Sequence, residues 1–367
     1  MNTDFKNVNS ISKDLCTGCM ACLHTCPEKC IHTDWMEGFE YPKCNEELCI
    51  KCGKCVRSCP IIQQQKLETD PEIVCAMNKC TEIRENSSSG GVFYELALHI
   101  IKQGGAVCGA GFNKSMKVIH KIVDDEENLV DLMRSKYVQS NLGNCFSEIR
   151  GLLECGRTVL FVGTPCQVNG LSSFLGKRYE GLLLIDLICH GVPSPIIWEE
   201  FVTIMEKRFG SKCCYVSFRD TSLEGWHNYG MYMEFENGKS YVDTQNNNMF
   251  MKGFLYGYYD RRSCYACNFK GLNRKSDLTL GDFWSVKRYL ENFDDNKGTS
   301  LVFLNSVKGK TAFNSVRDRF DFKVLSGGDV LKYSGAYTNS EIDMENRERF
   351  YPRYLSGEST FDIISAL

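Results

Sequence analysis

The sequence predicts two domains, a small cysteine-rich α+β domain followed by a larger α/β domain. Three observations lead to this prediction. Two short runs of cysteine lie within the first 60 residues, a polar segment ending in a proline follows them, and the remainder alternates short apolar runs with helical patterns. That remainder, roughly 300 residues, is long enough to bury a core of its own. We expect the domains at residues 1–66 and 72–367, joined by a connector over 61–72.

The two cysteine runs share one spacing, three cysteines separated by two residues each and a fourth that precedes a proline. This spacing is typical of bacterial ferredoxins with two 4Fe-4S clusters, in which the fourth cysteine of each run binds the other cluster. The expected ligand assignment is therefore crossed. The first thiol group is Cys16, Cys19, Cys22 and Cys59, and the second thiol group is Cys49, Cys52, Cys55 and Cys26.

The alternatives for these runs are a zinc site or a disulfide framework. Zinc needs only four ligands per site, and the complete repeated pattern of eight cysteines, with a proline after each fourth one, favours clusters over both alternatives. Cys30 and Cys44 lie inside the module but outside the pattern. We expect each of them to be a small buried thiol and assign them no chemistry.

Composition bounds the compartment and the partners. Clusters require reduced thiolates, and 21 cysteines in 367 residues would mispair in an oxidising compartment, so we expect a soluble, cytoplasmic protein. The N-terminus has no apolar signal segment, and the most apolar later stretch, residues 181–192, is too short to span a bilayer. A net charge of −3 with mixed signs predicts neither nucleic-acid nor membrane binding.

In the larger domain, strands are expected at 105–112, 117–123, 158–162, 182–188 and 301–305. Two of these runs end in the same way. The strand at 158–162 is followed by a turn with Cys166, and the strand at 182–188 by a turn with Cys189. Ligands bind at the carboxyl ends of strands in α/β sheets, so these two cysteines indicate a site more than a core.

A further pair, Cys264 and Cys267, forms a C-x2-C turn that follows two arginines. Alone it fits half a zinc site, a redox dithiol or two cluster ligands. Together with Cys166 and Cys189 it gives four thiols, and our hypothesis is a third 4Fe-4S cluster held by this third thiol group. The alternative is that these cysteines only pack in the core.

The segment from Glu85 to Ala97 is a polar, glycine-bearing loop that opens an amphipathic helix. Serine hydroxyls and free amides at a helix N-terminus favour a phosphate, which is compatible with a cofactor that carries a pyrophosphate. An ordinary serine N-cap explains the same residues, and the loop has neither a G-x-G-x-x-G nor a Walker A pattern. The loop alone therefore leaves both explanations open.

Five ordered motifs, at 87–91, 135–140, 163–167, 186–191 and 280–284, together with the cysteine set, resemble the coenzyme F-420 hydrogenase/dehydrogenase beta-subunit family in the form with an N-terminal dicluster ferredoxin domain. The resemblance covers the chain from Cys16 to about Trp284. It implies an α+β ferredoxin-like dicluster domain followed by a larger α/β flavin-binding domain, with FAD and a proximal 4Fe-4S cluster in the latter. The residues that it implies around FAD are Ser87, Ser88, Ser89, Gly90 and Gly91 at the phosphates and Lys136, Tyr137 and Ser140 at the flavin.

The expected function is electron transfer between ferredoxin-type clusters and, through FAD, a two-electron (hydride) substrate such as a deazaflavin or a small organic molecule. The alternative is an electron-transfer subunit that feeds a partner enzyme. Expected partners are a ferredoxin or another redox protein, a small-molecule redox substrate and, in an oligomer, further copies of the chain. Asp282 and His190 fit either a position beside the cofactor or a structural role, and no catalytic residue is assigned.

Overall fold

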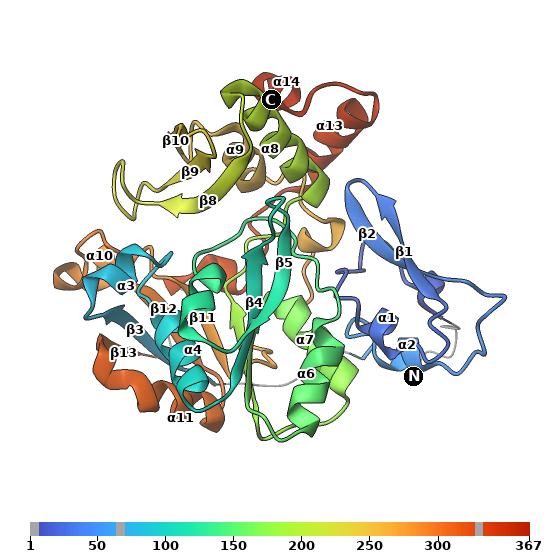
Figure 1. Ribbon diagram of the computed structural model, residues 1–367, viewed down its shortest axis with the longest axis horizontal. Coiled ribbons are helices and arrows are strands. Elements are labelled where there is room, and N and C mark those ends of the chain that lie inside the picture. Colours follow the sequence, from blue (N-terminus) through green and yellow to red (C-terminus); the bar gives the residue numbers. More distant parts are fainter. Residues whose placement is uncertain (1–6, 64–69, 327–332) are drawn as a thin grey trace.

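The computed structural model describes residues 7–63, 70–326 and 333–367. It has three parts (Figure 1): an N-terminal module, a large mixed sheet covered by helices on both faces, and a lobe built on a second sheet, shown at the top of the view. The small α+β region followed by a larger mixed α/β domain agrees with the predicted fold class. Residues 64–69 of the predicted connector, and with them the expected boundary at residue 66, lie outside the described residues.

The N-terminal module combines one hairpin with two short helices, which follow the cysteine turns. Its elements are α1 (Ala21–Thr25), β1 (Ile31–Met36), β2 (Phe39–Cys44) and α2 (Lys54–Arg57). Each helix begins after a residue in the left-handed region, Met20 at φ 56° and Gly53 at φ 70°. This equivalent geometry reflects the repeated cysteine spacing, because each turn must fold back to aim three thiols at one point.

The large sheet has the strand order β13-β3-β12-β11-β7-β6-β4-β5. Its four central strands, β11, β7, β6 and β4, are parallel, and the strands outside them pair antiparallel. The strands are β3 (Glu72–Asn78), β4 (Ala106–Phe112), β5 (Val118–Val123), β6 (Val159–Gly163), β7 (Leu182–Leu187), β11 (Leu278–Asp282), β12 (Ser300–Leu304) and β13 (Phe320–Leu325). All five strands expected from the sequence are present, with ends shifted by one residue at most.

Helices cover both faces of this sheet, so its central strands are largely apolar, with the buried Asp186 of β7 and Thr279 of β11 as exceptions. Alternate residues of β6 show this: Leu160 packs in the core below α4 (Val92–Lys102) and α11 (Val307–Val316), whereas Val159 and Phe161 pack against α6 (Cys145–Glu154) and α7 (Pro165–Leu175). Side chains of successive strand residues point to opposite faces, so a strand buried on both sides carries an unbroken apolar run.

The upper lobe joins a three-stranded antiparallel sheet to four helices around an aromatic core. Its elements are α8 (Pro195–Phe209), β8 (Cys213–Asp220), β9 (Gly230–Phe235), β10 (Ser240–Thr244), α9 (Met249–Leu255), α13 (Met344–Leu355) and α14 (Thr360–Ala366). On β8, Cys213 is buried and Cys214 is exposed, as expected for adjacent residues of a strand. The remaining short α-helices within the described residues are α3 (Thr81–Glu85), α5 (Glu126–Leu129) and α10 (Val286–Tyr289).

The tip of the β1–β2 hairpin attaches the module to the rest of the chain. Glu37 accepts hydrogen bonds from Arg262 at 2.8 and 2.6 Å and from the buried Arg347. Burial opposes the charge of Glu37, yet these two guanidinium groups lower its pKa. The next residue, Gly38, accepts a hydrogen bond from the Ser194 hydroxyl at 3.0 Å through its carbonyl. The module is therefore fixed by a buried ionic contact as well as by apolar packing.

No described helix combines the length and the apolar character that crossing a bilayer requires.

Candidate cofactor and cluster sites

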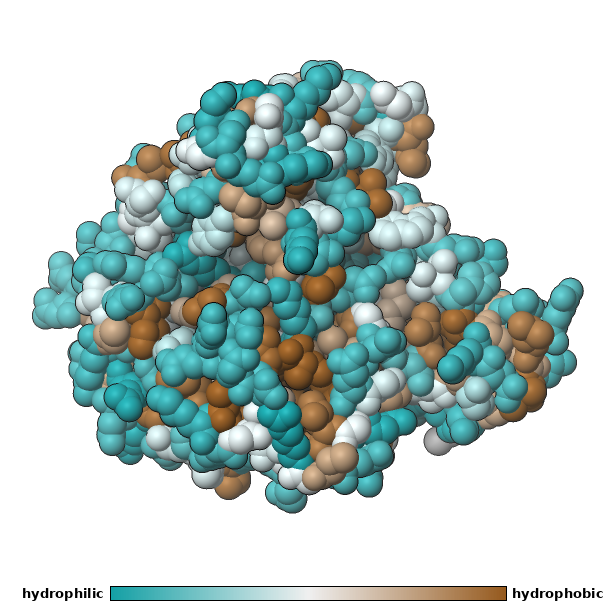
Figure 2. All heavy atoms as spheres, in the orientation of Figure 1, coloured by the Kyte–Doolittle hydropathy of each residue, from teal (hydrophilic) through white to brown (hydrophobic). Residues whose placement is uncertain are grey.

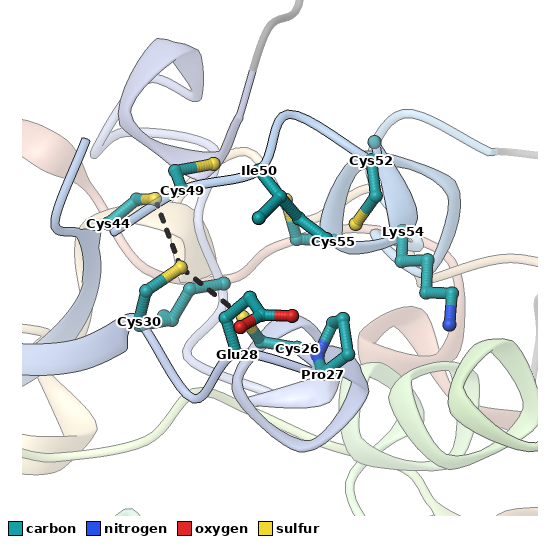
Figure 3. Close-up of a pocket in the computed structure, with 12 residues that line it drawn as sticks. Cys26, Pro27, Glu28, Cys30, Cys44, Cys49, Ile50, Cys52, Lys54 and Cys55 are labelled. Atoms are coloured by element: carbon teal, nitrogen blue, oxygen red, sulfur yellow. Dashed lines mark hydrogen bonds between the residues drawn. The ribbon is translucent and has the colours of Figure 1, made fainter. Parts of the chain in front are cut away.

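The second thiol group surrounds a small cavity in the N-terminal module. Cys26, Cys49, Cys52 and Cys55 all line this cavity, and Cys59 does not. Figure 3 shows Cys26 on the lower side of the cavity and the other three ligands above it. The fold thus brings the fourth cysteine of the first run to the three closely spaced cysteines of the second run.

The first thiol group lies in the interior, next to the main domain. Burial raises the pKa of Cys19 to about 12, and the neighbouring thiols of Cys59, Cys16 and Cys166 act in the same direction. Burial also raises the pKa of Cys22, whose neighbours include Cys19, Cys16 and Cys59. Thiols with such pKa values stay protonated at neutral pH unless a metal centre displaces the proton.

The third thiol group gathers where three segments of the main domain meet. Cys166 lies in the first turn of α7, Cys189 follows β7, and Cys264 and Cys267 lie beside the bridge between Pro193 and Asp260. Burial raises the pKa of Cys166 to about 11, and the neighbouring Cys267 thiol raises it as well. Burial raises the pKa of Cys264 well above its ordinary value, and Asp260, Cys189, Cys267 and Cys166 all add to the shift. The four thiols therefore lie close enough to influence one another's charge.

Helix α7 links the third thiol group to the first. A side chain at Gly170 would meet Cβ of Cys19 at 2.7 Å and its Sγ at 3.0 Å, so this helix packs directly on the module only because residue 170 is glycine. Four residues earlier on the same helix lies Cys166, which belongs to the third group. The first and third groups are neighbours across this one contact.

Arg261 lies between the same two groups. Its guanidinium, which is buried, donates to the Cys16 carbonyl at 2.8 Å, to the Glu40 carbonyl at 3.0 Å and to the Gln139 side chain at 3.0 Å. It also lies 4.0 Å from the centre of the Tyr41 ring. A fixed positive charge here favours the thiolate form of nearby cysteines, and it lowers the pKa of Cys166 against the effect of burial.

A large cavity of about 700 Å³ opens between the edge of the main sheet and the upper lobe. The serine loop lines it through Ser87, Ser88, Ser89 and Gly91, and Lys136, Tyr137 and Ser140 line it as well. Cys189 of the third thiol group is part of the same wall. Figure 2 gives the space-filling view of the molecule, in which the upper lobe stands over the main body. The cavity therefore joins the predicted cofactor residues to a predicted cluster ligand.

Within the serine loop the three hydroxyls differ. The Ser87 hydroxyl donates to the Ile83 carbonyl at 2.7 Å, and the Ser88 oxygen accepts from the backbone amide of Ser135 at 2.7 Å. The Ser89 hydroxyl is buried and has no hydrogen-bond partner within the described structure. Gly91 has φ 81° at the N-cap of α4. Ser89 and the start of α4 are thus the groups left to receive a ligand.

Gly90 is placed differently from its expected role at the phosphates. It does not line the cavity, and a Cβ on it would meet the Ala76 carbonyl at 2.1 Å and the Ser300 amide at 2.7 Å. Its amide donates to the Ser300 hydroxyl at 2.9 Å. Gly90 is required for the packing of the loop on β3 and β12, and a side chain there would disturb the sheet rather than reach a phosphate directly.

Arg219 stabilises the serine loop through a hydrogen bond to the loop backbone. This fully buried guanidinium pairs with Asp282 at 2.8 Å and donates to the Ser88 carbonyl at 2.9 Å and to the Tyr137 hydroxyl at 3.1 Å. Trp226 donates to the same Ser88 carbonyl at 3.0 Å. The sequence left Asp282 either a position beside the cofactor or a structural role. Asp282 lines the cavity, and there it is the counter-ion of Arg219.

The flavin-side residues form one hydrogen-bonded chain with a buried histidine. Gln167 donates to the Ser140 hydroxyl at 2.9 Å, and that hydroxyl contacts Nδ1 of His120 at 2.9 Å. The other ring nitrogen, Nε2, lies 3.2 Å from the Val162 carbonyl. Burial lowers the pKa of His120 to about 4, so the ring is neutral at pH 7, with its proton on Nε2 and Nδ1 accepting from Ser140.

Lys136 and His190 also line this cavity. Lys136 donates to the Asp131 carbonyl at 2.9 Å, and burial lowers the pKa of its ammonium to about 7. His190 lies 3.9 Å from Glu341 through Nδ1, and its buried Nε2 has no hydrogen-bond partner among the described residues. The Nε2 atom of His190 and the Ser89 hydroxyl are therefore polar atoms left unpaired in the wall of the cavity.

Several residues of these sites were not identified from the sequence. Arg219 and His120 lie in strands where nothing local marks them as site residues, and only the tertiary pairing brings them to the cavity. Gln167 belongs to the motif at 163–167, but the sequence assigned it no role. Asp260 is a further case: burial raises its pKa to about 7, and neither carboxylate oxygen has a hydrogen-bond partner in the described structure. The sequence analysis noted Arg261 and Arg262 before Cys264, but it did not predict that they contact the N-terminal module.

Comparison with known proteins identifies both parts of the chain. Residues 156–326 match the family described as the C terminus of the beta subunit of coenzyme F420 hydrogenase/dehydrogenase, and residues 15–61 match a 4Fe-4S dicluster domain. The second match contains all eight cysteines of the two runs. The first contains the third thiol group, while the serine loop and residues 135–140 precede it.

A solved structure of the F420-reducing nickel–iron hydrogenase complex from Methanosarcina barkeri contains a similar chain, with 16% identity and a TM-score of 0.49. The alignment covers 80% of this chain and 94% of that one. No curated protein matches the chain in sequence.

Proposed function

Because the chain belongs to the coenzyme F420 hydrogenase/dehydrogenase beta-subunit family and carries an N-terminal 4Fe-4S dicluster domain, we propose that it is an FAD-dependent and 4Fe-4S-dependent oxidoreductase. It exchanges electrons with a ferredoxin or another redox protein at its clusters and exchanges a hydride with a small-molecule substrate at FAD. The observation that carries this proposal is the shared cavity, whose wall contains both the serine loop and Cys189.

The chain's residues fit FAD. The cavity of about 700 Å³ is within the size range of cofactor pockets, and its wall combines apolar and aromatic groups with many polar and charged side chains. The unpaired Ser89 hydroxyl and the start of α4 would hold the phosphates. Lys136, Tyr137 and Ser140 would lie along the flavin, with Ser140 oriented by Gln167 and His120.

When bound, FAD supplies two-electron exchange with a substrate and single-electron exchange with a neighbouring cluster. The chain's residues hold and shield it. Arg219 fixes the serine loop through Ser88, and the Lys136 ammonium, with its pKa near 7, places a proton and a positive charge in the cavity wall. Nε2 of His190 is the unpaired ring nitrogen that would contact a ligand.

A 4Fe-4S cluster suits the third thiol group better than zinc does. Zinc has no redox chemistry and cannot carry electrons. An electron path between the N-terminal clusters and FAD needs a one-electron carrier beside the cavity, and a 4Fe-4S cluster bound by four cysteines supplies one.

Anaerobic purification of the full chain tests this proposal. We expect heat-released flavin to be FAD and not FMN. With ferredoxin as its only protein partner, the purified chain should oxidise or reduce a deazaflavin or a small organic substrate. A preparation that holds clusters but no flavin would overturn the proposal. Activity that appears only with a co-purifying protein would instead support the second candidate, an electron-transfer subunit of a larger complex.

A further inference from the structure

Two cysteines outside the eight-cysteine pattern, Cys30 and Cys44, lie against the second thiol group. Sγ of Cys30 is 3.4 Å from Sγ of Cys26 and 3.9 Å from Sγ of Cys44. The sulfurs of Cys30, Cys44 and Cys49 all lie within 4.8 Å of one another. Figure 3 shows Cys30 next to Cys26 and Cys44 next to Cys49, whereas Cys52 lies on the opposite side of the cavity.

The β1–β2 hairpin keeps both thiols in place. Cys30 precedes β1, Cys44 is the last residue of β2, and the backbone partner of Cys44 across the hairpin is Ile31. Both side chains are buried, and both line the cavity of the second thiol group. The cavity wall therefore carries six thiols where one cubane needs four.

The first half of the module provides an internal comparison. Cys30 lies four residues after Cys26, and Gln63 lies four residues after Cys59. Cys44 lies five residues before Cys49, and the residue five before Cys16 is Ile11. The position equivalent to Cys44 in the first half is held by a partly buried apolar residue, Ile11. The two extra thiols thus occur at the second group and not at the equivalent positions of the first.

We propose that Cys30 and Cys44 are reserve ligands of the second cluster, Cys44 for Cys49 and Cys30 for Cys26. The inference rests on the proposed ligand assignment of the second thiol group. On loss of Cys49 as a ligand, its iron–sulfur bond is replaced by a bond from the same iron to Sγ of Cys44, and the thiol proton of Cys44 passes to solvent. No electron is gained or lost, so the exchange needs no oxidant or reductant.

The second group is the one that needs such protection. Cys52 is exposed, and Leu48 and Ile50 beside Cys49 are 60% and 61% exposed. Small oxidants reach a cluster at the surface before one at the interior, where the first group lies. Cys52 itself has neither extra thiol beside it.

Iron content of the anaerobically purified full chain, in buffer without added thiols, tests the proposal. We expect Cys49→Ala and Cys44→Ala to retain the iron of the wild type, and the variant with both changes to lose about four irons per chain. Cys52→Ala and Cys16→Ala are the matched controls, and each is expected to lose about four irons, because no reserve thiol lies beside either ligand. The EPR spectrum of the second cluster in Cys49→Ala should differ from that of the wild type, since one ligand has moved.

Equal loss of iron in Cys49→Ala and Cys52→Ala would overturn the reserve role while leaving the ligand assignment intact. Full retention of iron in Cys52→Ala and Cys16→Ala would overturn the assignment itself, and the reserve role with it. The FAD content reports whether each variant has folded, and in the variants of Cys44, Cys49 and Cys52 the EPR signal of the first cluster does so as well. If the variant with both Cys44→Ala and Cys49→Ala keeps FAD and the first cluster and also keeps the second cluster, the result counts against the proposal.

Discussion

The Ser89 hydroxyl is the residue that most directly reports on the cofactor. It is buried in the cavity wall without a partner, whereas the Ser87 hydroxyl is bonded to the Ile83 carbonyl. We expect Ser89→Ala to weaken FAD binding roughly 10- to 100-fold, because a hydrogen bond to a charged group contributes about 1.5–3 kcal/mol. Ser87→Ala is the matched control and should bind FAD nearly as the wild type does. Flavin retained on dilution measures both, and equal affinity in the two variants would contradict the assignment of Ser89.

His120 makes the stability of the folded chain depend on pH. Burial lowers its pKa to about 4, below the ordinary value, so the unfolded chain binds a proton that the folded chain does not between about pH 6.5 and pH 4. Stability therefore falls as pH falls through this window. Between pH 7 and pH 5, we expect the wild type to lose about 2 kcal/mol more than His120→Gln. Thermal unfolding followed by circular dichroism under argon measures this, and parallel curves for the two proteins would refute it.

At the scale of elements, the β1–β2 hairpin attaches the cluster module. Gly38, at its tip, has φ 74°, and a Cβ there would meet the Ser194 hydroxyl at 2.1 Å. Gly104 has a similar φ of 78° with nothing within 4 Å of a Cβ. Gly104→Ala should lose about 1–2 kcal/mol for the left-handed backbone alone.

Gly38→Ala adds a steric clash to that cost, so we expect a larger loss of stability and faster release of the N-terminal module by a protease. The thermal midpoint of unfolding and the rate of proteolysis, measured for Gly38→Ala and for Gly104→Ala, test this difference. Similar values for both would mean that the hairpin tip does not fix the module.

The strands of the main sheet were largely predictable, because the spacing of apolar residues and the residue types at turns are local properties of the sequence. The five expected strands follow from apolar runs that end at glycine or polar residues. The role of Gly90 was not predictable, because a glycine in a serine loop suits a phosphate and a close packing contact equally well. Only the position of the Ala76 carbonyl, 14 residues earlier in the chain, decides between them.

At the scale of the whole molecule, sequence spacing indicated which cysteines belong together, and the fold brings each set to one place. How the sets lie relative to one another could not be read from the sequence. It depends on Gly170 against Cys19 and on Arg261 between Cys16 and the C-x2-C turn, contacts between residues about 150 to 245 positions apart. Such distant pairings leave no local pattern. The same holds for Arg219 behind the serine loop.

The central claim is that the main domain holds FAD beside a third cluster, and metal and flavin content of the anaerobically purified full chain tests it most directly. The wild type should contain about 12 irons and one FAD per chain, and Cys264→Ala combined with Cys267→Ala should contain about eight irons with FAD retained. The variant with both Cys213→Ala and Cys214→Ala, whose thiols point to opposite sides of β8, should match the wild type. A wild type with only eight irons, or a C-x2-C variant that keeps all 12, would contradict the account.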